Sequence, residues 1–138
     1  MKHYIRLLII LPALLFLAGC TKDNTPQSVS SKISSDSWQV TYYWDKDKDE
    51  TYKFQGYSFS FNSNNTLEVT TPSGTETGTW VFDNSDDSHD HFIITLPDKE
   101  PLDDLIDDWH VITITDQVIE LKDESGSGGI EYLTFKIK

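Results

Sequence analysis

The side chains best suited to chemistry in this chain of 138 residues are one cysteine, a few histidines and many carboxylates. Nucleophilic catalysis needs a Ser or Cys beside a His and an acid. The only cysteine is Cys20, and the glycine-rich run at 125–129 lacks the strand-to-helix setting of a nucleophile elbow. Adjacent carboxylates such as Asp103 and Asp104 would suit a glycosidase, but acid runs in so acidic a chain are typical of solvated faces. We therefore predict no catalytic residues and no enzymatic activity.

The histidines offer a second kind of chemistry, metal binding. His89 and His91 share one face at a strand start, and His110 on a later strand would complete a three-histidine site of the catalytic-zinc kind. The alternative is that His89 and His91 are exposed side chains of the Asp-rich stretch at 83–90. We favour this alternative, and expect no metal ligands and no cofactor.

Alternate acids at Asp45, Asp47 and Asp49 resemble the start of a calcium-binding loop. An EF-hand loop would next need Gly at its sixth position and Glu at its twelfth, where this chain has Glu50 and Gly56. A looser calcium site on the surface stays open as an alternative. We expect instead a charged hairpin loop between the first two strands.

The sole cysteine follows a segment with its own pattern. Residues 1–19 carry Lys2 and Arg6, then an apolar run at 7–18 and no acid, which is the layout of a secretory signal peptide. The sequence Leu-Ala-Gly-Cys at 17–20 resembles the lipobox of bacterial lipoproteins, in which the cysteine receives acyl chains such as palmitate. The alternative is an ordinary signal beside a chance cysteine. We predict that Cys20 is lipidated, and that residues 20–36, rich in Ser, Thr, Lys and Asp, form a flexible tether.

The formal net charge is −12, and removal of the signal leaves 9 lysines against 23 acidic residues, or −14, with no arginine. Nucleic-acid binding needs clustered cations, so it is excluded as a function. A lone cysteine excludes an internal disulfide. About 119 residues suffice for one domain, which we place at 37–138. The location predicted is the cell envelope, as an outer-membrane lipoprotein on the periplasmic or the surface face.

The rest of the chain indicates an all-β fold. Turn clusters separate segments rich in Thr, aromatic and β-branched residues, and the alternation at 57–61 puts Tyr57, Phe59 and Phe61 on one face. Short links imply antiparallel neighbours, hence an eight-stranded up-and-down barrel. The eight strands expected are at 37–44, 52–62, 66–71, 77–82, 92–96, 110–115, 118–122 and 129–137.

A helical segment and an aromatic core complete this prediction. Residues 101–107 begin with a proline and carry an apolar stripe of Leu102, Leu105 and Ile106, which favours a short helix able to plug one end of the barrel. An eight-stranded barrel is barely wide enough for its own side chains or one small ligand. The candidates to fill it are Trp38, Trp80, Trp109, Phe59, Phe61, Phe82 and Phe135.

The order of several short motifs suggests a family. They are Ser-Trp-Gln-Val-Thr at 37–41, the alternating aromatics at 56–61 with Asn-Asn-Thr-Leu at 64–67, Gly-Thr-Trp at 78–80, Asp-Trp-His-Val at 108–111 and Ile-Glu-Leu at 119–121. Placed after a lipobox, this series resembles the lipocalin-like lipoproteins of Bacteroidetes. The resemblance covers residues 36–138, and implies an eight-stranded barrel with a binding role.

Three functions from different classes stay open. The first is binding of a small, largely apolar, neutral or cationic molecule at the open end of the barrel, with Tyr42, Trp44 and Tyr57 as contacts because their rings combine a flat surface with a polar group. The second is a non-catalytic interaction or structural lipoprotein with a packed barrel and an unknown protein partner. The third, a hydrolase, ranks last.

Overall fold

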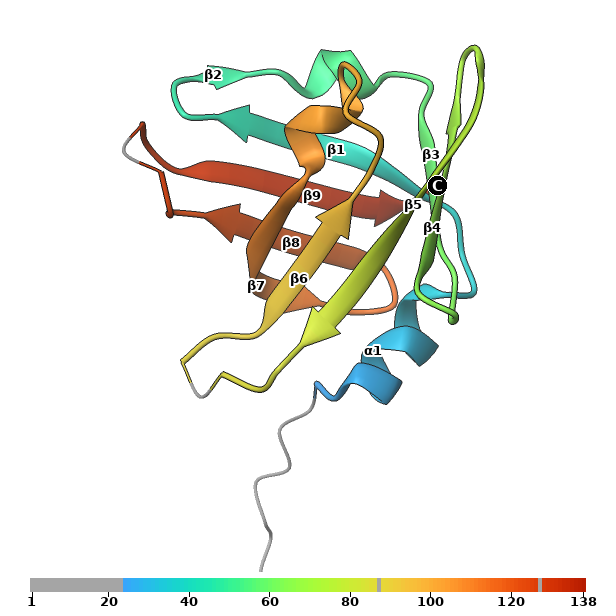
Figure 1. The fold of residues 1–138 in the computed structure, drawn as a ribbon, viewed down its shortest axis with the longest axis vertical. Helices are drawn as coiled ribbons and strands as arrows, with labels where there is room; N and C mark the ends of the chain where they lie inside the picture. The colour runs from blue at the N-terminus through green and yellow to red at the C-terminus, as the bar shows by residue number, and fades with distance from the viewer. Residues whose placement is uncertain (1–23, 87, 127) are drawn as a thin grey trace, which may run out of the picture.

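The structure, a computed structural model, is a closed antiparallel β-barrel, and it describes residues 24–86, 88–126 and 128–138 (Figure 1). The predicted signal peptide and Cys20 lie outside these residues. The described chain has one α-helix and two 3-10 helices, which are α1 (Pro26–Ile33), η1 (Thr51–Phe54) and η2 (Leu102–Leu105). Its strands are β1 (Trp38–Asp45), β2 (Lys48–Asp49), β3 (Ser58–Phe61), β4 (Thr66–Thr71), β5 (Gly74–Asp83), β6 (His91–Thr95), β7 (Asp107–Ile114), β8 (Val118–Asp123) and β9 (Glu131–Ile137).

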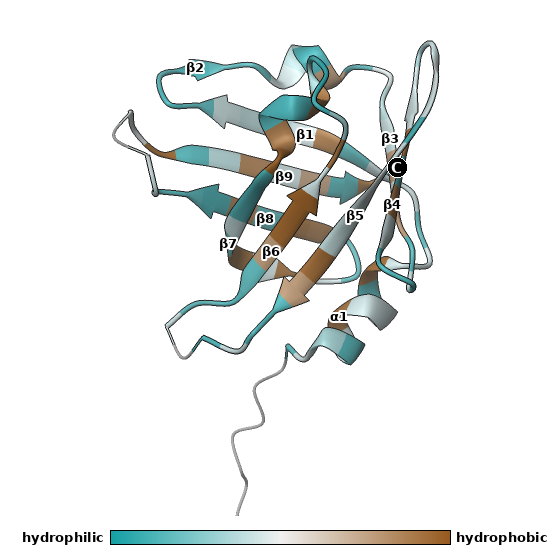
Figure 2. Ribbon diagram, in the orientation of Figure 1, coloured by the Kyte–Doolittle hydropathy of each residue, from teal (hydrophilic) through white to brown (hydrophobic). Residues whose placement is uncertain are grey.

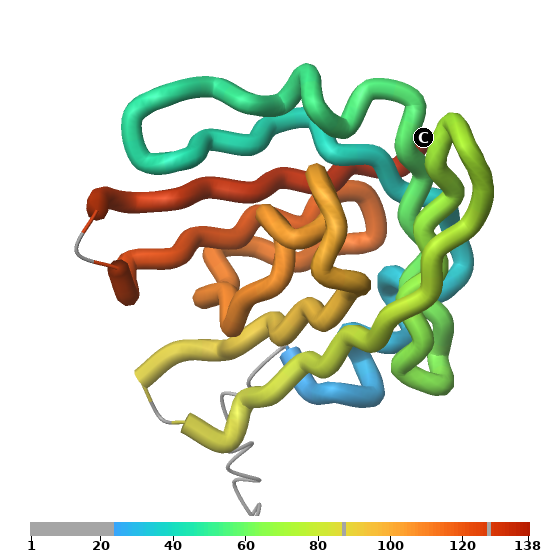
Figure 3. The backbone as a smooth tube through the Cα atoms, turned by 45° about the horizontal axis from the view of Figure 1, so that its top comes forward, coloured from blue at the N-terminus to red at the C-terminus, as the bar shows by residue number. Residues whose placement is uncertain are grey.

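The barrel follows the up-and-down order that short connections imply. From β3 to β9 each strand pairs with the next in antiparallel register, and β9 then pairs with β1 from Trp38↔Ile137 to Trp44↔Tyr132. Figure 3 shows the first and last strands lying side by side. The two-residue β2 only extends a hairpin with β1. The prediction of an eight-stranded antiparallel barrel is thus confirmed.

Aromatic rings fill the interior. Phe61 lies among them, with edge-to-face contacts to Trp80, Phe92 and Phe135 at centroid distances of 5.9, 5.5 and 5.4 Å. All seven aromatic residues expected to fill the barrel are buried. Figure 2 shows apolar bands along the strands and hydrophilic residues in the connecting turns. The barrel is therefore packed by its own side chains.

One end of the barrel is covered by α1, in a segment where the sequence predicted a flexible tether. Thr25 caps this helix reciprocally with Ser28, and Pro26 occupies its first turn. Val29 and Ile33, one helical turn apart, are completely buried. The tether prediction is wrong for residues 26–33, because this i,i+4 apolar pair gives the polar segment a face that packs on the barrel.

The opposite end is covered by the two 3-10 helices. Leu102 and Leu105 of η2 are buried, and Trp109 Nε1 donates to the Leu105 carbonyl at 3.1 Å, so the predicted helical plug at 101–107 is present as a shorter 3-10 turn.

The strand predicted at 52–62 is wrong in its first half. There η1 turns Phe54 into the core, and Gly56 with φ of +83° redirects the chain before β3 begins.

Among the described residues, no helix is long and apolar enough to cross a bilayer. Both ends of the barrel carry helical covers. The open mouth expected from the sequence is therefore missing at the α1 end and at the η1–η2 end, and a ligand would have to bind elsewhere.

Candidate functional site

A cleft lies where the first strand separates from the rest of the barrel wall. β1 and β3 share a single register pair, Trp38↔Phe59, whereas β1 and β9 pair over most of their length. Beyond Trp38 the chain of η1 and residues 55–57 faces β1 without strand pairing. Phe54 fills the inner part of the gap, and the outer part stays open.

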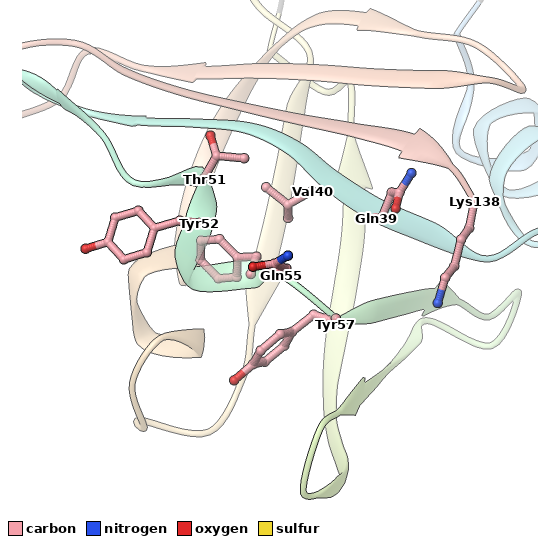
Figure 4. A pocket seen from close by; sticks show the side chains of 9 residues that line it. Gln39, Val40, Thr51, Tyr52, Gln55, Tyr57 and Lys138 are labelled. Carbon is pink, nitrogen blue, oxygen red and sulfur yellow. The ribbon is translucent and has the colours of Figure 1, made fainter.

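This opening, here called the seam cleft, has a volume of about 330 Å³. Figure 4 shows Gln39 and Lys138 at one end in this view, and Tyr52 at the other. The cleft is lined by Gln39, Val40, Thr51, Tyr52, Phe54, Gln55, Gly56, Tyr57 and Lys138. Its volume falls at the lower end of the range typical of small-molecule sites.

The lining combines an apolar floor with polar walls. Val40 and Phe54 are buried and form the floor, while the partly buried Tyr57 packs against the core. Gln39 and Gln55 add amides, and Lys138 is the only charged side chain in the lining. Apolar rings beside uncharged hydrogen-bonding groups suit a small molecule with one flat apolar face and a few polar groups.

A larger hollow of about 600 Å³ lies outside β8 and β9, but it offers a poorer site. Thr115, Asp116, Gln117, Lys136 and Ile137 in its lining are all exposed, and none of its lining residues is buried. It is a surface depression, whereas the seam cleft rests on buried side chains. The seam cleft is therefore the better candidate.

Hydrogen bonds and ring contacts hold η1 beside the cleft. Thr51 Oγ1 accepts from the Tyr43 backbone N–H at 2.8 Å, and the Thr51 N–H donates to Asp49 Oδ1 at 2.9 Å. Phe54 meets Tyr43 and Tyr57 edge-to-face at 5.5 and 6.1 Å. These contacts fix the aromatic wall of the cleft relative to β1.

An ion-pair network joins η1 to η2 behind this wall. Lys53 Nζ lies 2.5 Å from Glu50 Oε2 and 2.8 Å from Asp104 Oδ2, and Lys48 Nζ lies 2.6 Å from Glu50 Oε1. These lysines lower the pKa of Glu50, and hydrogen bonds to Asp104 and Glu50 raise the pKa of Lys53. The carboxylate of Glu50, which follows the alternate acids at 45–49, is thus neutralised by two lysines.

The residues predicted to bind a ligand do not converge on one site. Tyr57 lines the seam cleft, but Tyr42 is exposed on the outer face of β1. Trp44 donates its indole N–H to the Lys46 carbonyl at 3.1 Å in the β1–β2 hairpin, and is absent from the cleft lining. Cys20, the predicted lipidation site, lies outside the described residues.

Sequence reasoning missed most of the cleft, including Gln39, Gln55 and Lys138. Because 52–62 was predicted as one strand paired with its neighbours, no gap beside β1 was expected. Gly56 was the available signal, since glycine inside a strand pattern marks a bend or bulge. The outward position of Gln39 follows from strand alternation once Trp38 and Val40 are placed inside.

His89, His91 and His110, the candidates for a metal site, lie together. His91 and His110 are cross-strand partners with ring centroids 5.1 Å apart, and His89 stacks on His110 at 4.6 Å. His91 Nδ1 lies 2.8 Å from Asp108 Oδ1, and this hydrogen bond is the main reason that the pKa of His91 is raised. Within the described residues, no three His, Cys, Asp or Glu side chains are arranged to hold a metal ion.

Comparison with solved structures shows a likeness in fold. A crystal structure of a DUF4847 family protein from Bacteroides vulgatus is similar to this chain, with a TM-score of 0.54 and 16% sequence identity. The alignment covers 78% of this chain and 96% of that protein. No family model and no curated protein matches the sequence. At this identity the likeness concerns the fold alone.

Proposed function

We propose that this chain is an exported lipoprotein, acylated at Cys20 and held at the outer membrane, whose barrel binds a small molecule in the seam cleft and catalyses no reaction. The observation that carries the binding role is the cleft itself, because Val40, Phe54 and Tyr57 give it a packed apolar floor while the barrel interior is full. The lipobox resemblance supports the anchor. The motif series supports kinship with lipocalin-like lipoproteins, and the Bacteroides neighbour supports the barrel fold.

The cleft chemistry narrows the ligand. Gln39, Gln55 and Thr51 provide neutral donors and acceptors, and Tyr57 provides a flat ring. The protein's net charge of −12 disfavours anions at long range, although Lys138 offers one local cation. The ligand proposed is therefore a small, largely apolar molecule that is neutral or cationic overall.

Fluorescence titration of the domain beginning after Cys20 tests the binding role. The probes are neutral N-phenyl-1-naphthylamine, cationic thioflavin T and anionic anilinonaphthalene sulfonate, at moderate salt. We expect saturable responses to the first two that are lost in Tyr57→Ala and kept in Tyr42→Ala, the matched control outside the cleft. If no probe gives saturation, or both variants behave alike, the seam cleft is not the binding site.

Metabolic labelling with a fatty-acid probe tests the anchor. The unaltered chain should incorporate the probe and fractionate with membranes, while Cys20→Ser should do neither. Labelling of both chains, or of neither, would remove the lipoprotein from the proposal.

A second function follows if no small molecule binds. The filled interior and the covers at both ends favour a packed accessory lipoprotein that acts through its surface. Tyr52, with 71% of its surface exposed beside the cleft, is the large side chain best placed to contact a protein partner.

A further inference from the structure

The helix α1 is built into the barrel, and this fixes where the chain leaves it. The Ile33 carbonyl accepts a hydrogen bond from the buried indole N–H of Trp38 at 2.9 Å. With Val29 and Ile33 completely buried, the helix is bound by both packing and hydrogen bonding. Undocking it would expose Trp38, so α1 belongs to the folded domain.

Asn24, two residues before the helix, is also held. Asn84 Nδ2 in the β5–β6 connection donates to the Asn24 carbonyl at 3.0 Å, and Lys32 Nζ donates to Asn24 Oδ1 at 3.1 Å. Within the described residues, the chain is therefore held on the barrel from Asn24 onward. Cys20 precedes it by four residues in the sequence, and four residues span at most about 14 Å even when fully extended.

We propose that the α1 end of the barrel faces the lipid bilayer, within about 14 Å of the anchored cysteine. This orientation rests on the lipid anchor in the proposed function. A tether that stayed free up to Ser37 would reach about 60 Å and would allow any orientation. With α1 docked, the opposite end of the barrel cannot turn toward the membrane without unfolding the helix.

The topology assigns the loops to each end. The turn at 62–65 lies beside α1, since Ser63 and Asn65 line a hollow together with Pro26 and Gln27 of the helix. The connection at 84–90 lies there too, because Asn84 contacts Asn24. The turn at 72–73, η1 and η2 lie at the other end, and Figure 1 shows α1 and η1 at opposite ends of the barrel. One wall of the seam cleft thus points away from the bilayer.

The membrane-facing end carries exposed charges of both signs. Asp36, Asp86 and Asp116 are exposed on or next to its loops, and Lys136 and Lys138 are exposed where β9 ends beside Trp38. Charges of both signs give no strong net attraction to anionic headgroups, so the acyl anchor and the short sequence between Cys20 and Asn24 hold the barrel near the bilayer. The orientation should therefore persist at high salt, which screens electrostatic contacts.

Paramagnetic relaxation measures this orientation directly. The chain beginning at Cys20 is coupled through its thiol to a maleimide-headgroup lipid in bicelles of zwitterionic lipid that also contain a gadolinium-headgroup lipid. Two exposed turns that flank the six-residue β4 are compared through the amide signals of Ser63 and Ser73. Their separation along the barrel is roughly 15 Å after strand tilt. Because relaxation falls with the sixth power of distance, we expect it to be several-fold stronger at Ser63.

A matched control uses the same chain with a flexible Gly/Ser segment of about 20 residues inserted before Asn24, which should make the two signals equal. Equal relaxation in the uninserted chain, or stronger relaxation at Ser73, would overturn the orientation. Because the coupling supplies the lipid chemically, this result is independent of whether the cell acylates Cys20. Failure of the labelling test therefore removes the anchor alone, and failure here removes the orientation alone.

Discussion

Trp80 shows what a single core side chain contributes to the barrel. Its ring stacks on Phe92 at 5.6 Å, meets Phe61 edge-to-face, and donates its indole N–H to the Asn62 carbonyl at 2.9 Å. We expect Trp80→Ala to lower the free energy of unfolding by about 3–5 kcal/mol. The neighbouring Val81→Ala, on the exposed face of the same strand, should change it by less than about 1 kcal/mol. Urea unfolding measures both, and equal effects would show that Trp80 is not a core residue.

His91 gives the stability of the protein a pH dependence with a definite sign. Its pKa is raised above 6.5, mainly by the hydrogen bond to Asp108 and further by Asp86, although burial opposes the shift. The stabilisation is therefore complete below about pH 6.5, and is lost as the pH rises through the raised folded pKa. We expect Asp108→Asn to lower the His91 pKa in an NMR titration and to destabilise the protein in mild acid only.

The double variant His91→Gln with Asp108→Asn provides the control, since a neutral side chain at 91 removes the proton that the pair binds. The substitution at 108 should then have the same effect at about pH 5.5 and about pH 8.5. A pH-dependent effect that survives in the His91→Gln background would show that a group other than His91 is responsible for the titration.

At the scale of elements, Gly78 explains how β5 and β6 approach each other. A Cβ added at this position would overlap the Thr95 carbonyl oxygen and touch Leu96. We expect Gly78→Ala to force the strands apart and to lower the free energy of unfolding by about 1–3 kcal/mol. Gly74→Ala is an informative comparison. A Cβ there would meet open space, so the only cost of the substitution is the backbone strain of an alanine at φ of +154°. If Gly78→Ala has the same melting temperature as the unaltered protein, the contact at Thr95 is looser than described.

The elements that sequence predicted best are those with period-two alternation. In β3 and β4, buried and outward residues alternate as the amino-acid types do, so strand positions and the core face follow directly. Helix α1 was not predicted, because two apolar residues in a Ser-rich stretch are too few for a periodic signal. Only their packing on the barrel makes the helix stable. The short η1 was missed for a related reason, since its aromatic residues suit a strand equally well.

The candidate site was less predictable than the fold, because it forms where β1 and β3 are not paired. Tyr57 was identified through its ring and its place near a strand end. Gln39 and Lys138 could not be identified from the sequence, since they line one cleft only because β1 and β3 separate there. The clustering of His91 with His110 likewise depends on the β6–β7 register, which sequence alone does not specify.

For the molecule as a whole, we predict folding without metal. A single core of buried aromatic and aliphatic side chains runs through the barrel, and the free energy of folding comes from that burial. Chelator should therefore leave the melting curve unchanged, and elemental analysis should find no stoichiometric zinc. A large loss of stability in chelator would instead assign a structural metal to the histidines around His110.

The closure between β1 and β9 also governs the order in which the chain can fold. The hairpins from β3 to β9 join neighbours in sequence, whereas Trp38↔Ile137 joins positions about a hundred residues apart. Contacts of such separation form late, because the entropy of closing the loop must be overcome first. Until then the backbone groups along the facing edges of β1 and β9 are open to other chains. We therefore expect closure of this one strand pair to limit the rate of folding, and the chain to be most prone to aggregation just before closure.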